Sequence, residues 1–214
     1  SEITAPMVLR CLRKIEAKGN YATARRLRGV IGSVFRYAIA NGAATTDPTY
    51  ALRDALVRSR SKPRAAITDP KIFGELLRAI DDYHGQVVTR MGLQLLALVA
   101  TRPGELRLAR WDEFDFEKRE WMIPWERTKM RRPHRMPLSG RMIEILQSLR
   151  ELTGSTGYLL PSMVSSKRVM SENTFNTALR RMGFGAEEMT AHGFRASFST
   201  LANESGLWNP DAIE

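Results

Sequence analysis

Apolar residues in the N-terminal part of the chain recur at helical spacing. The pattern over residues 3–17 predicts a helix that stops near Gly19. A second, longer helix is predicted over residues 20–42, with Thr23 as its N-cap and Gly42 after its end. Its apolar stripe has a period of 3.6 residues and consists of Leu27, Val30, Ile31, Val34, Phe35, Ala38 and Ile39.

The pattern changes between residues 57 and 66. A short helix is expected over Tyr50–Val57, and the segment VRSRSKPRAA then contains four basic residues and no large apolar residue after its first valine. Such a composition is typical of a linker, so we expect two domains, residues 1–62 and 63–214. The basic side chains of the linker are also available to phosphates.

The second domain combines helices with one segment of a different pattern. The motif ITDP predicts a helix start, with Thr68 or Asp69 as N-cap and Pro70 at the first position. Residues 111–138 contain short stretches rich in Trp, Phe and Ile, which predict a small three-stranded antiparallel sheet. Helices are expected at about 70–82, at 87–100, at 139–151 with Ser139 as cap, at 171–182 with Ser171 as cap and Gly183 after it, from Thr190, and at 209–214. The predicted fold class is mainly α, with the small sheet in the second domain.

Positive charge is concentrated near the N-terminus of this chain, whose formal net charge is +10. Residues 1–66 contain 13 Lys and Arg against 4 Asp and Glu, whereas residues 67–214 contain 20 against 19. A basic module joined to a nearly neutral one favours a polyanionic partner, and solubility is the alternative explanation of the charge. Arg25, Arg28 and Arg36 lie off the apolar stripe of the second helix, where they can meet phosphates.

Several protein classes are disfavoured by the composition. The chain has no apolar run near the roughly eighteen residues of a membrane span and no signal-peptide core after its first charges. Its single cysteine, Cys11, excludes an internal disulfide and a cysteine-rich zinc site, which suits a reducing cytosol. The three histidines and the scattered carboxylates lack metal-ligand spacing, and no P-loop or G-x-S-x-G motif occurs. A metal-dependent nuclease and an ATPase are therefore poorly supported.

Three segments could carry chemistry, and the first is ATRPGELR. Arg102 follows a predicted buried helix and Pro103 begins the next one, where the amides of a helix N-terminus favour an anion. Glu105 follows three residues on and could orient the Arg102 guanidinium. The alternative is a surface Arg–Glu pair that contributes little.

The second segment, ERTKMRRPHR, holds five basic residues between Arg127 and Arg135. A basic turn between two strands could reach a nucleic-acid groove or a phosphate, and a lysine at its tip, Lys129, could protonate a leaving oxygen. Nothing local distinguishes Lys129 from Arg131 or Arg132. An ordinary solvated turn is the alternative explanation.

The third segment, TAHGFRASFST, places His192 and Arg195 on one face of a helix. A histidine can exchange a proton near neutral pH, and an arginine offers two donors to a phosphate. Small neighbouring residues leave room for a close approach. For this short motif alone, a capped helix end whose histidine satisfies a backbone carbonyl is the favoured explanation.

The order of these segments resembles that of the tyrosine recombinases, and most closely the phage and genomic-island integrases. The resemblance rests on TRPGEL, IPWERTKMRRPHRMPLS, SENTFNTALRRMGF and TAHGFRASFSTLANE, and it extends over essentially the whole chain. It implies that residues 1–62 are a helical core-binding domain incomplete on its N-terminal side. Residues 63–214 would be a catalytic domain incomplete on its C-terminal side, and the two domains would clamp a duplex from opposite sides.

The resemblance also implies a role for each motif residue. Enzymes of this family cleave DNA through a 3′-phosphotyrosine without a metal or nucleotide cofactor. Arg102 and Arg195 would hold the non-bridging oxygens of the scissile phosphate, with Glu105 supporting Arg102. Lys129 would be the general acid for the 5′-oxygen, and His192 a proton acceptor or hydrogen-bond partner. DNA contacts are expected from Arg25, Arg28, Arg36, Lys62, Arg64, Arg131 and Arg132.

The chain departs from the family pattern after His192. The family's nucleophilic tyrosine follows H-x-x-R, but all five tyrosines of this sequence precede His192. Trp208 fits core packing better than the further His/Trp position of the family. We therefore expect a fragment that binds DNA and does not cleave it by itself.

The expected partner is double-stranded DNA carrying attachment sites. A homotetramer on DNA is expected for the full-length protein, with DNA-bending and directionality proteins as accessories, in the bacterial cytoplasm at the nucleoid. No cofactor and no membrane association are expected. The alternatives are a non-catalytic DNA-binding regulator or architectural protein, and a type IB topoisomerase, which shares the chemistry.

Overall fold

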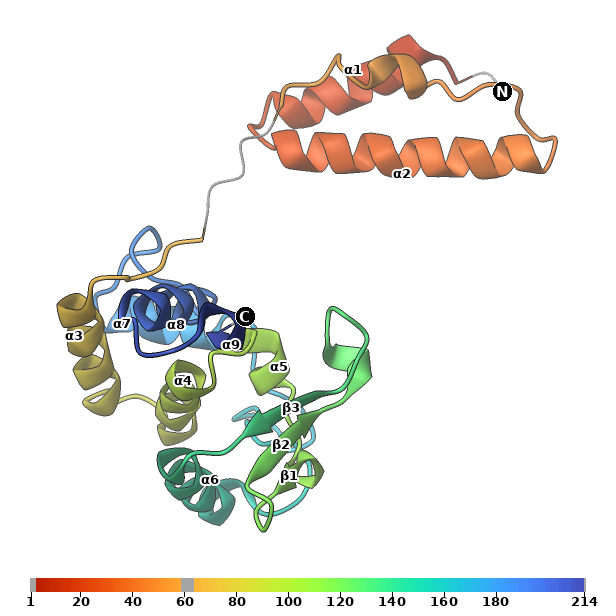
Figure 1. The fold of residues 1–214 in the computed structure, drawn as a ribbon. Helices are drawn as coiled ribbons and strands as arrows, with labels where there is room; N and C mark the ends of the chain where they lie inside the picture. The colour runs from red at the N-terminus through yellow and green to blue at the C-terminus, as the bar shows by residue number, and fades with distance from the viewer. Residues whose placement is uncertain (1–2, 59–63, 214) are drawn as a thin grey trace. The chain divides into compact units, whose positions relative to one another are not determined.

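The computed structural model describes residues 3–58 and 64–213, which form two compact units. The units are residues 1–62 and residues 63–214, and Figure 1 shows the order of helices and strands in each. No helix within the described ranges is long and apolar enough to cross a membrane.

The N-terminal unit is a helical pair with a short 3-10 turn. Its elements are α1 (Ala5–Glu16), α2 (Tyr21–Ala40) and η1 (Tyr50–Leu52). Both predicted long helices are confirmed, and each is followed by a glycine at positive φ. The buried side chains that close the core of this unit are Val8, Leu12, Leu52 and Leu56.

The apolar stripe predicted on α2 is only partly buried. Leu27 and Ile31 pack against the core and Phe35 is buried, but Val30 and Val34 are 54% and 61% exposed. Helical periodicity identifies an apolar face but does not specify how much of that face a neighbour covers. The predicted stripe is therefore wider than the face that is buried in the structure.

Two further expectations for this unit were wrong. Thr23 lies inside α2, because the helix begins one turn earlier with Asn20 as its N-cap. Only the first residues of the expected helix over 50–57 are helical, as η1. Asp47 instead organises the preceding turn by accepting hydrogen bonds from the amide and the hydroxyl of Thr49, at 2.8 and 2.7 Å.

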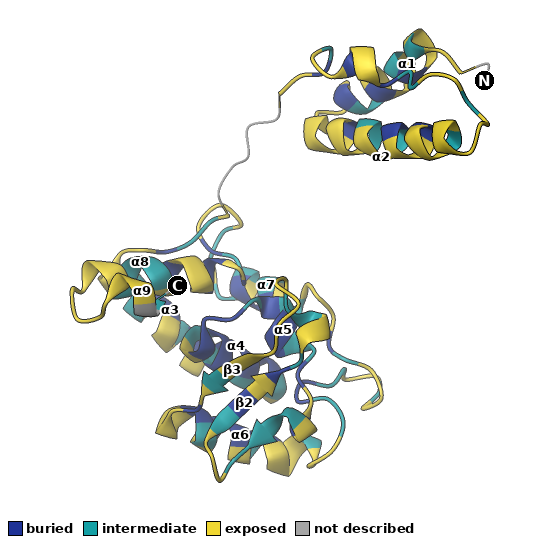
Figure 2. Ribbon diagram, turned by 45° about the vertical axis from the view of Figure 1, so that its right-hand side comes forward, coloured by how far each residue is buried: buried dark blue, intermediate teal, exposed yellow. Residues whose placement is uncertain are grey.

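The C-terminal unit is built around α4 (Val87–Val99), which is buried along most of its length (Figure 2). Four longer helices pack against or near it, and two short helices complete the helical part of the unit. These are α3 (Pro70–Asp81), α6 (Gly140–Thr153), α7 (Thr174–Arg181) and α8 (Gly193–Glu204), with α5 (Pro103–Arg107) and α9 (Pro210–Ile213). The central position of α4 explains its apolar sequence, because a helix contacted from several sides needs few polar residues.

Helix starts in this unit follow local capping chemistry at two predicted positions. The Asp69 carboxylate accepts the amide hydrogens of Lys71 and Ile72 at the start of α3, with Pro70 in the first turn. The Ser139 hydroxyl accepts the amide hydrogen of Met142 at the start of α6. Both caps were predicted correctly.

The predicted three-stranded antiparallel sheet is confirmed. Its strands are β1 (Phe114–Asp115), β2 (Glu120–Ile123) and β3 (His134–Pro137), in the order β1-β2-β3. Two 3-10 turns flank it, η2 (Trp111–Glu113) before β1 and η3 (Trp125–Arg127) after β2. The fully buried Trp121 ring stacks on Phe114 at a centroid distance of 5.3 Å, which ties the sheet to the core.

Three expectations near the C-terminus were wrong. The helix α7 begins at Thr174 with Asn173 as N-cap, because the Ser171 hydroxyl accepts the Asn173 amide hydrogen in a preceding turn. The helix α8 begins at Gly193 rather than Thr190, whose hydroxyl accepts the Gly193 amide hydrogen. Trp208 is 65% exposed, because it lies in the connection between α8 and α9 and outside the core.

Two helical glycines provide a matched test of packing around α4. A Cβ at Gly92 would lie 2.8 Å from the ring of the buried Phe175, whereas a Cβ at Gly74 in α3 would meet only Arg78 Nη1, at 3.5 Å. We expect Gly92→Ala to destabilise the protein by about 1–3 kcal/mol through overpacking. Gly74→Ala should stabilise it by up to about 1 kcal/mol through helix propensity. Urea unfolding of both variants checks this, and equal effects would contradict the packing of α7 on α4.

Candidate functional site

A short turn at the end of α4 organises the candidate site. Ala100 ends the helix in the left-handed conformation, with φ of 49°, and the chain then passes through the buried Thr101 to Arg102, the N-cap of α5. A left-handed alanine costs about 1–2 kcal/mol, so the buried surroundings must hold this conformation in place. The backbone of the turn is therefore held by the core.

Arg102 is held on this turn by a buried carboxylate. Its Nη1 donates to Glu105 Oε1 at 2.7 Å, and its backbone amide donates to Glu105 Oε2 at 3.0 Å. The Glu105 side chain is 7% exposed and that of Arg102 is 40% exposed. Because the carboxylate is buried, the pair differs from an ordinary surface ion pair. The remaining donors of the guanidinium have no hydrogen-bond partner within residues 3–58 and 64–213, so they are available to a ligand.

Arg195 reaches the same turn from α8. Its Nη1 donates to the carbonyl oxygen of Ala100 at 3.2 Å. A carbonyl orients the guanidinium without neutralising its charge, so Arg195 retains its attraction for an anion. The structure thus brings together two of the predicted arginines, which approach one turn from distant parts of the sequence.

His192 is the N-cap residue of α8 and lies close to two of the positive charges. Burial lowers the pKa of His192 below its ordinary value of 6.5, and the charges of Arg64 and Arg102 lower it further. A neutral imidazole can accept a proton or donate a hydrogen bond near neutral pH. His192 therefore belongs to the same site as Arg102, and Arg64 lies at its border.

The helix α7 holds the segment that leads to His192. Asn176 Oδ1 accepts the amide hydrogen of Ala191 at 2.9 Å. One turn along the same face, the Arg180 guanidinium donates to the carbonyl oxygens of Phe184 and Met189. These positioning residues were not identified from the sequence, although both lie within SENTFNTALRRMGF and their four-residue spacing was available.

The first described residues of this unit pack against the start of α8. The Ala65 carbonyl accepts hydrogen bonds from the amide and the hydroxyl of Thr190, both at 3.2 Å. A Cβ at Gly193 would lie 2.4 Å from that carbonyl oxygen, so only glycine allows this approach. The linker expected over 57–66 therefore ends earlier than predicted, and its residues 59–63 lie outside the described ranges.

Lys129 lies in the loop between β2 and β3, as predicted, together with Arg131 and Arg132. All three side chains are exposed, and Arg131 has a positive φ of 51°. The Lys129 ammonium group has no hydrogen bond or ion pair to any part of the chain that the structure describes. The structure does not bring Lys129 into contact with the two arginines.

A groove of about 610 Å³ connects the sheet with Arg195. Its walls include Leu98 from α4, Met136 from β3 and Phe198 from α8, and His134 lies at its edge. Because β3 lines this groove, the strand that follows the Lys129 loop borders the arginine site.

The remaining predicted DNA contacts lie in the N-terminal unit. Arg25, Arg28 and Arg36 are on α2, and Arg36 Nη1 donates to Asp47 at 3.2 Å, which balances part of its charge. Arg28 and Arg36 line a hollow of about 520 Å³. Lys62 lies outside the described residues.

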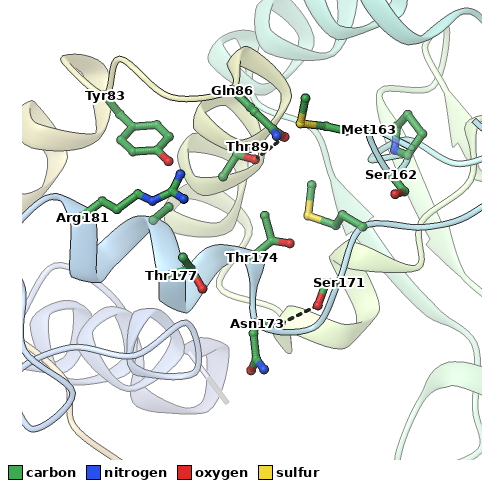
Figure 3. Close-up of a pocket in the computed structure, with 13 residues that line it drawn as sticks. Tyr83, Gln86, Thr89, Ser162, Met163, Ser171, Asn173, Thr174, Thr177 and Arg181 are labelled. Atoms are coloured by element: carbon green, nitrogen blue, oxygen red, sulfur yellow. Dashed lines mark hydrogen bonds between the residues drawn. The ribbon is translucent and has the colours of Figure 1, made fainter. Parts of the chain in front are cut away.

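A second hollow in the C-terminal unit, of about 320 Å³, contains none of the predicted site residues. Figure 3 shows Tyr83, Gln86 and Thr89 on one side of it and Thr177 and Arg181 of α7 on the other. Its lining combines polar and apolar side chains. No group of three or more His, Cys, Asp or Glu that could hold a metal ion occurs within residues 3–58 and 64–213.

Two buried hydroxyls next to the site have no hydrogen-bond partner among the described residues. They belong to Thr101, which directly precedes Arg102, and to Ser197, which follows Arg195 by two residues in α8. Their burial was not predicted, because Ser and Thr are mostly exposed in folded proteins.

Comparison with known proteins finds the same kind of relative, phage and prophage integrases, for both units of the chain. The family described as "Phage integrase central domain" matches residues 1–55, and "Phage integrase family" matches residues 68–214. The integrase of Enterobacteria phage P4 is 36% identical, over 95% of this chain and 49% of that protein. Prophage integrase IntA of Escherichia coli (strain K12) is 34% identical, over 100% of this chain and 51% of that protein. The chain thus spans about half the length of these relatives.

Solved structures share the fold. A lambda integrase dimer bound to a COC′ core site matches with a TM-score of 0.73 and 21% identity, over 100% of this chain and 77% of that one. The Tn1549 transposon integrase in complex with transposon right end DNA matches with a TM-score of 0.76 and 15% identity, over 99% and 76%. At these identities the likeness establishes the fold.

The charges around His192 lead to a prediction for its titration. We expect Arg64→Gln to raise the pKa of His192 part of the way toward 6.5, because one positive charge is removed while burial, the larger cause, remains. NMR titration of the imidazole measures this shift. Arg141→Gln on α6, where Arg141 pairs with Glu144, is the control and should leave the pKa of His192 unchanged.

The same lowered pKa affects stability. Below about pH 6.5 the unfolded chain takes up a proton at His192 before the folded chain does, so the contribution of this residue to stability falls as the pH falls. His192→Gln should remove that contribution. We would measure the unfolding free energy of both proteins in urea at pH 7.5 and at pH 5.5. The value for wild type minus the value for the variant should be smaller at pH 5.5 than at pH 7.5.

Proposed function

The chain belongs to the phage integrase family of tyrosine recombinases, and we propose that it carries the DNA-binding and phosphate-activating part of a site-specific recombinase. The proposed reaction integrates or excises a prophage or genomic island at attachment sites in double-stranded DNA. One observation carries the proposal. Arg102 and Arg195 are anchored to the same turn, their other guanidinium donors have no partner among the described residues, and the charge of Arg102 acts on His192.

This arrangement suits a phosphoryl group that gains negative charge. As phosphorus becomes five-coordinate, charge accumulates on its non-bridging oxygens, and fixed guanidinium groups stabilise it without reorganising. The Glu105 carboxylate would keep the Arg102 guanidinium in one orientation, and the Ala100 carbonyl would orient the guanidinium of Arg195. Neither guanidinium is fully neutralised, so both can hold the phosphate.

Proton transfers accompany the proposed cleavage. A tyrosine Oη attacks phosphorus and loses its proton, while the bond between phosphorus and the 5′-oxygen breaks, which leaves a 3′-phosphotyrosine. Lys129 gives a proton to the leaving 5′-oxygen and so yields a 5′-hydroxyl. His192, largely neutral near pH 7, would accept the tyrosine proton or hydrogen-bond the phosphate.

The nucleophile cannot come from the segment after His192 within these 214 residues. All tyrosines of the sequence precede that residue. We propose that the 214 residues bind DNA and need a tyrosine from additional chain in order to cleave it. The tetramer on DNA, the accessory proteins and the location at the bacterial nucleoid belong to the same proposal for the whole protein.

The two units would divide the binding of the duplex. Residues 1–62 would act as the core-binding domain, with Arg25 and Arg28 on phosphates, and residues 63–214 as the catalytic domain. Arg131 and Arg132 would meet the backbone from the β2–β3 loop. Phosphate contacts of this kind position a protein without reading sequence.

Replacing either arginine of the site tests the proposed function. In a chain that contains these residues and continues to a tyrosine, we expect Arg102→Ala or Arg195→Ala to lower cleavage of a nicked suicide substrate by about 10²–10³-fold while DNA binding is largely kept. Arg141→Ala, on α6, is the control. The unaltered 214-residue chain should form no covalent adduct. An adduct with that chain, or unchanged cleavage in both variants, would contradict the proposal.

The salt dependence of duplex binding tests the proposed phosphate contacts of the N-terminal unit. Arg25→Ala combined with Arg28→Ala should weaken duplex binding and lower the slope of log K against log salt by about 0.9 for each phosphate that the variant no longer neutralises. Fluorescence anisotropy of a labelled duplex over a range of salt concentrations measures both quantities. Arg10→Ala, which removes a charge from α1, is the control and should change the slope less.

A further inference from the structure

A largely buried ion pair lies at the base of the β2–β3 loop. Glu113, at the end of η2, and Arg127, at the end of η3, form a salt bridge through Glu113 Oε2 and Arg127 Nη2. The side chains are 10% and 14% exposed. The indole N–H of Trp121, in the middle of the sheet, donates to the same carboxylate oxygen at 3.0 Å. One carboxylate thus joins the loop to the core.

This pair is poorly suited to stabilising the fold as such. The Arg127 Nε and Nη1 atoms are buried and have no hydrogen-bond partner among the described residues. Buried charges lose hydration, and two apolar residues of similar size often stabilise a protein as well or better. A salt bridge fixes the relative orientation of its two side chains, because the donor and the acceptor must be aligned. An apolar contact does not fix the orientation in this way.

A turn closed by hydrogen bonds connects Arg127 to Lys129. The Arg127 amide donates to the Pro124 carbonyl within η3. The next residue, Thr128, closes the loop, since its hydroxyl donates to the Arg132 carbonyl at 2.7 Å and accepts the Arg132 amide hydrogen at 3.1 Å. Lys129 lies inside this turn, two residues from the anchored Arg127. Moving Arg127 would therefore move the backbone of Lys129.

We propose that Glu113 and Arg127 are positioning residues for Lys129, which has no hydrogen bond or ion pair of its own within the described ranges to hold it. The inference rests on the proposed role of Lys129 as the general acid. A general acid must lie within hydrogen-bond reach of the leaving oxygen, and a displacement of about 1 Å can cost about 10²-fold in rate. Glu113 and Arg127 need not touch the DNA in order to affect cleavage.

A change of leaving group distinguishes positioning of an acid from general damage. When the 5′-bridging oxygen of the scissile phosphate is replaced by sulfur, the leaving thiolate is a weak base and departs without a proton. Cleavage of the sulfur substrate therefore does not depend on Lys129. The arginines and the nucleophile are required for both substrates.

The experiment uses a chain that contains these 214 residues and continues to a tyrosine. The probes are nicked duplexes with oxygen or sulfur at the scissile position, carrying a core site selected by this protein from random-sequence DNA. Glu113→Gln should cleave the oxygen duplex about 10²-fold more slowly than wild type and the sulfur duplex within about threefold of it. Lys129→Ala should show the same pattern. Arg127→Lys, which keeps the charge and loses the fork, is the second variant if Glu113→Gln does not fold.

The control is a carboxylate on a strand of the neighbouring sheet. Glu120 on β2 faces Arg135 on β3 at 3.5 Å, and its side chain is 30% exposed, so Glu120→Gln should cleave both duplexes like wild type. Equal losses on the two duplexes in Glu113→Gln and Arg127→Lys, or no loss on either, would overturn the inference. Failure of the wild-type chain to cleave either duplex would instead count against the proposed function.

A measurement on the 214 residues needs no cleavage. Amide hydrogen exchange of the peptide spanning residues 124–133 should be faster in Glu113→Gln than in wild type, because Arg127 loses its ionic partner and the turn opens more often. The same peptide should exchange at the wild-type rate in Glu120→Gln. Unchanged exchange in Glu113→Gln would show that the pair does not hold the loop and would overturn the inference.

Discussion

The turn from Ala100 to Arg102 is the constraint on which the candidate site depends. Its left-handed first residue ends the buried α4 and presents a carbonyl to Arg195, and its last residue carries the guanidinium held by Glu105. Because α4 is packed from several sides, the turn cannot shift without disturbing the core. The two positive groups are thus fixed before any ligand arrives, which is the condition for effective electrostatic stabilisation of an anion.

The other two residues with a predicted catalytic role, His192 and Lys129, are held by different means. The segment that leads to His192 is held by two hydrogen bonds: Asn176 Oδ1 accepts the Ala191 amide hydrogen, and the Ala65 carbonyl accepts the Thr190 hydroxyl hydrogen. Lys129 depends on a loop whose base is tied to the core by a single carboxylate. The two arginines are therefore held on a turn fixed by the core, whereas Lys129 lies on an exposed loop. This division would suit the proposed reaction if phosphate binding precedes proton transfer.

The electrostatics follow from the same packing. Glu105 is the acidic partner of Arg102 and is buried, while Arg64 and Arg102 make the surroundings of His192 positive. Burial, the larger cause, and these positive charges both lower the pKa of the imidazole and so favour its neutral form near pH 7. Under the proposed function, a bound polyanion would lessen the effect of the charges, so ligand binding and the protonation of His192 would be coupled.

The sequence by itself determined the helices, the three-stranded sheet, the caps at Asp69 and Ser139, and the segments that hold Arg102, Lys129, His192 and Arg195. These features depend on periodicity, capping and short motifs, which are local properties of the chain. Only the packing of distant segments brings Arg195 to the Ala100 carbonyl, pairs Glu113 with Arg127 in a largely buried position, and leaves Val34 and Trp208 exposed. Each of these outcomes depends on which distant segments cover a residue, and a local pattern does not contain that information.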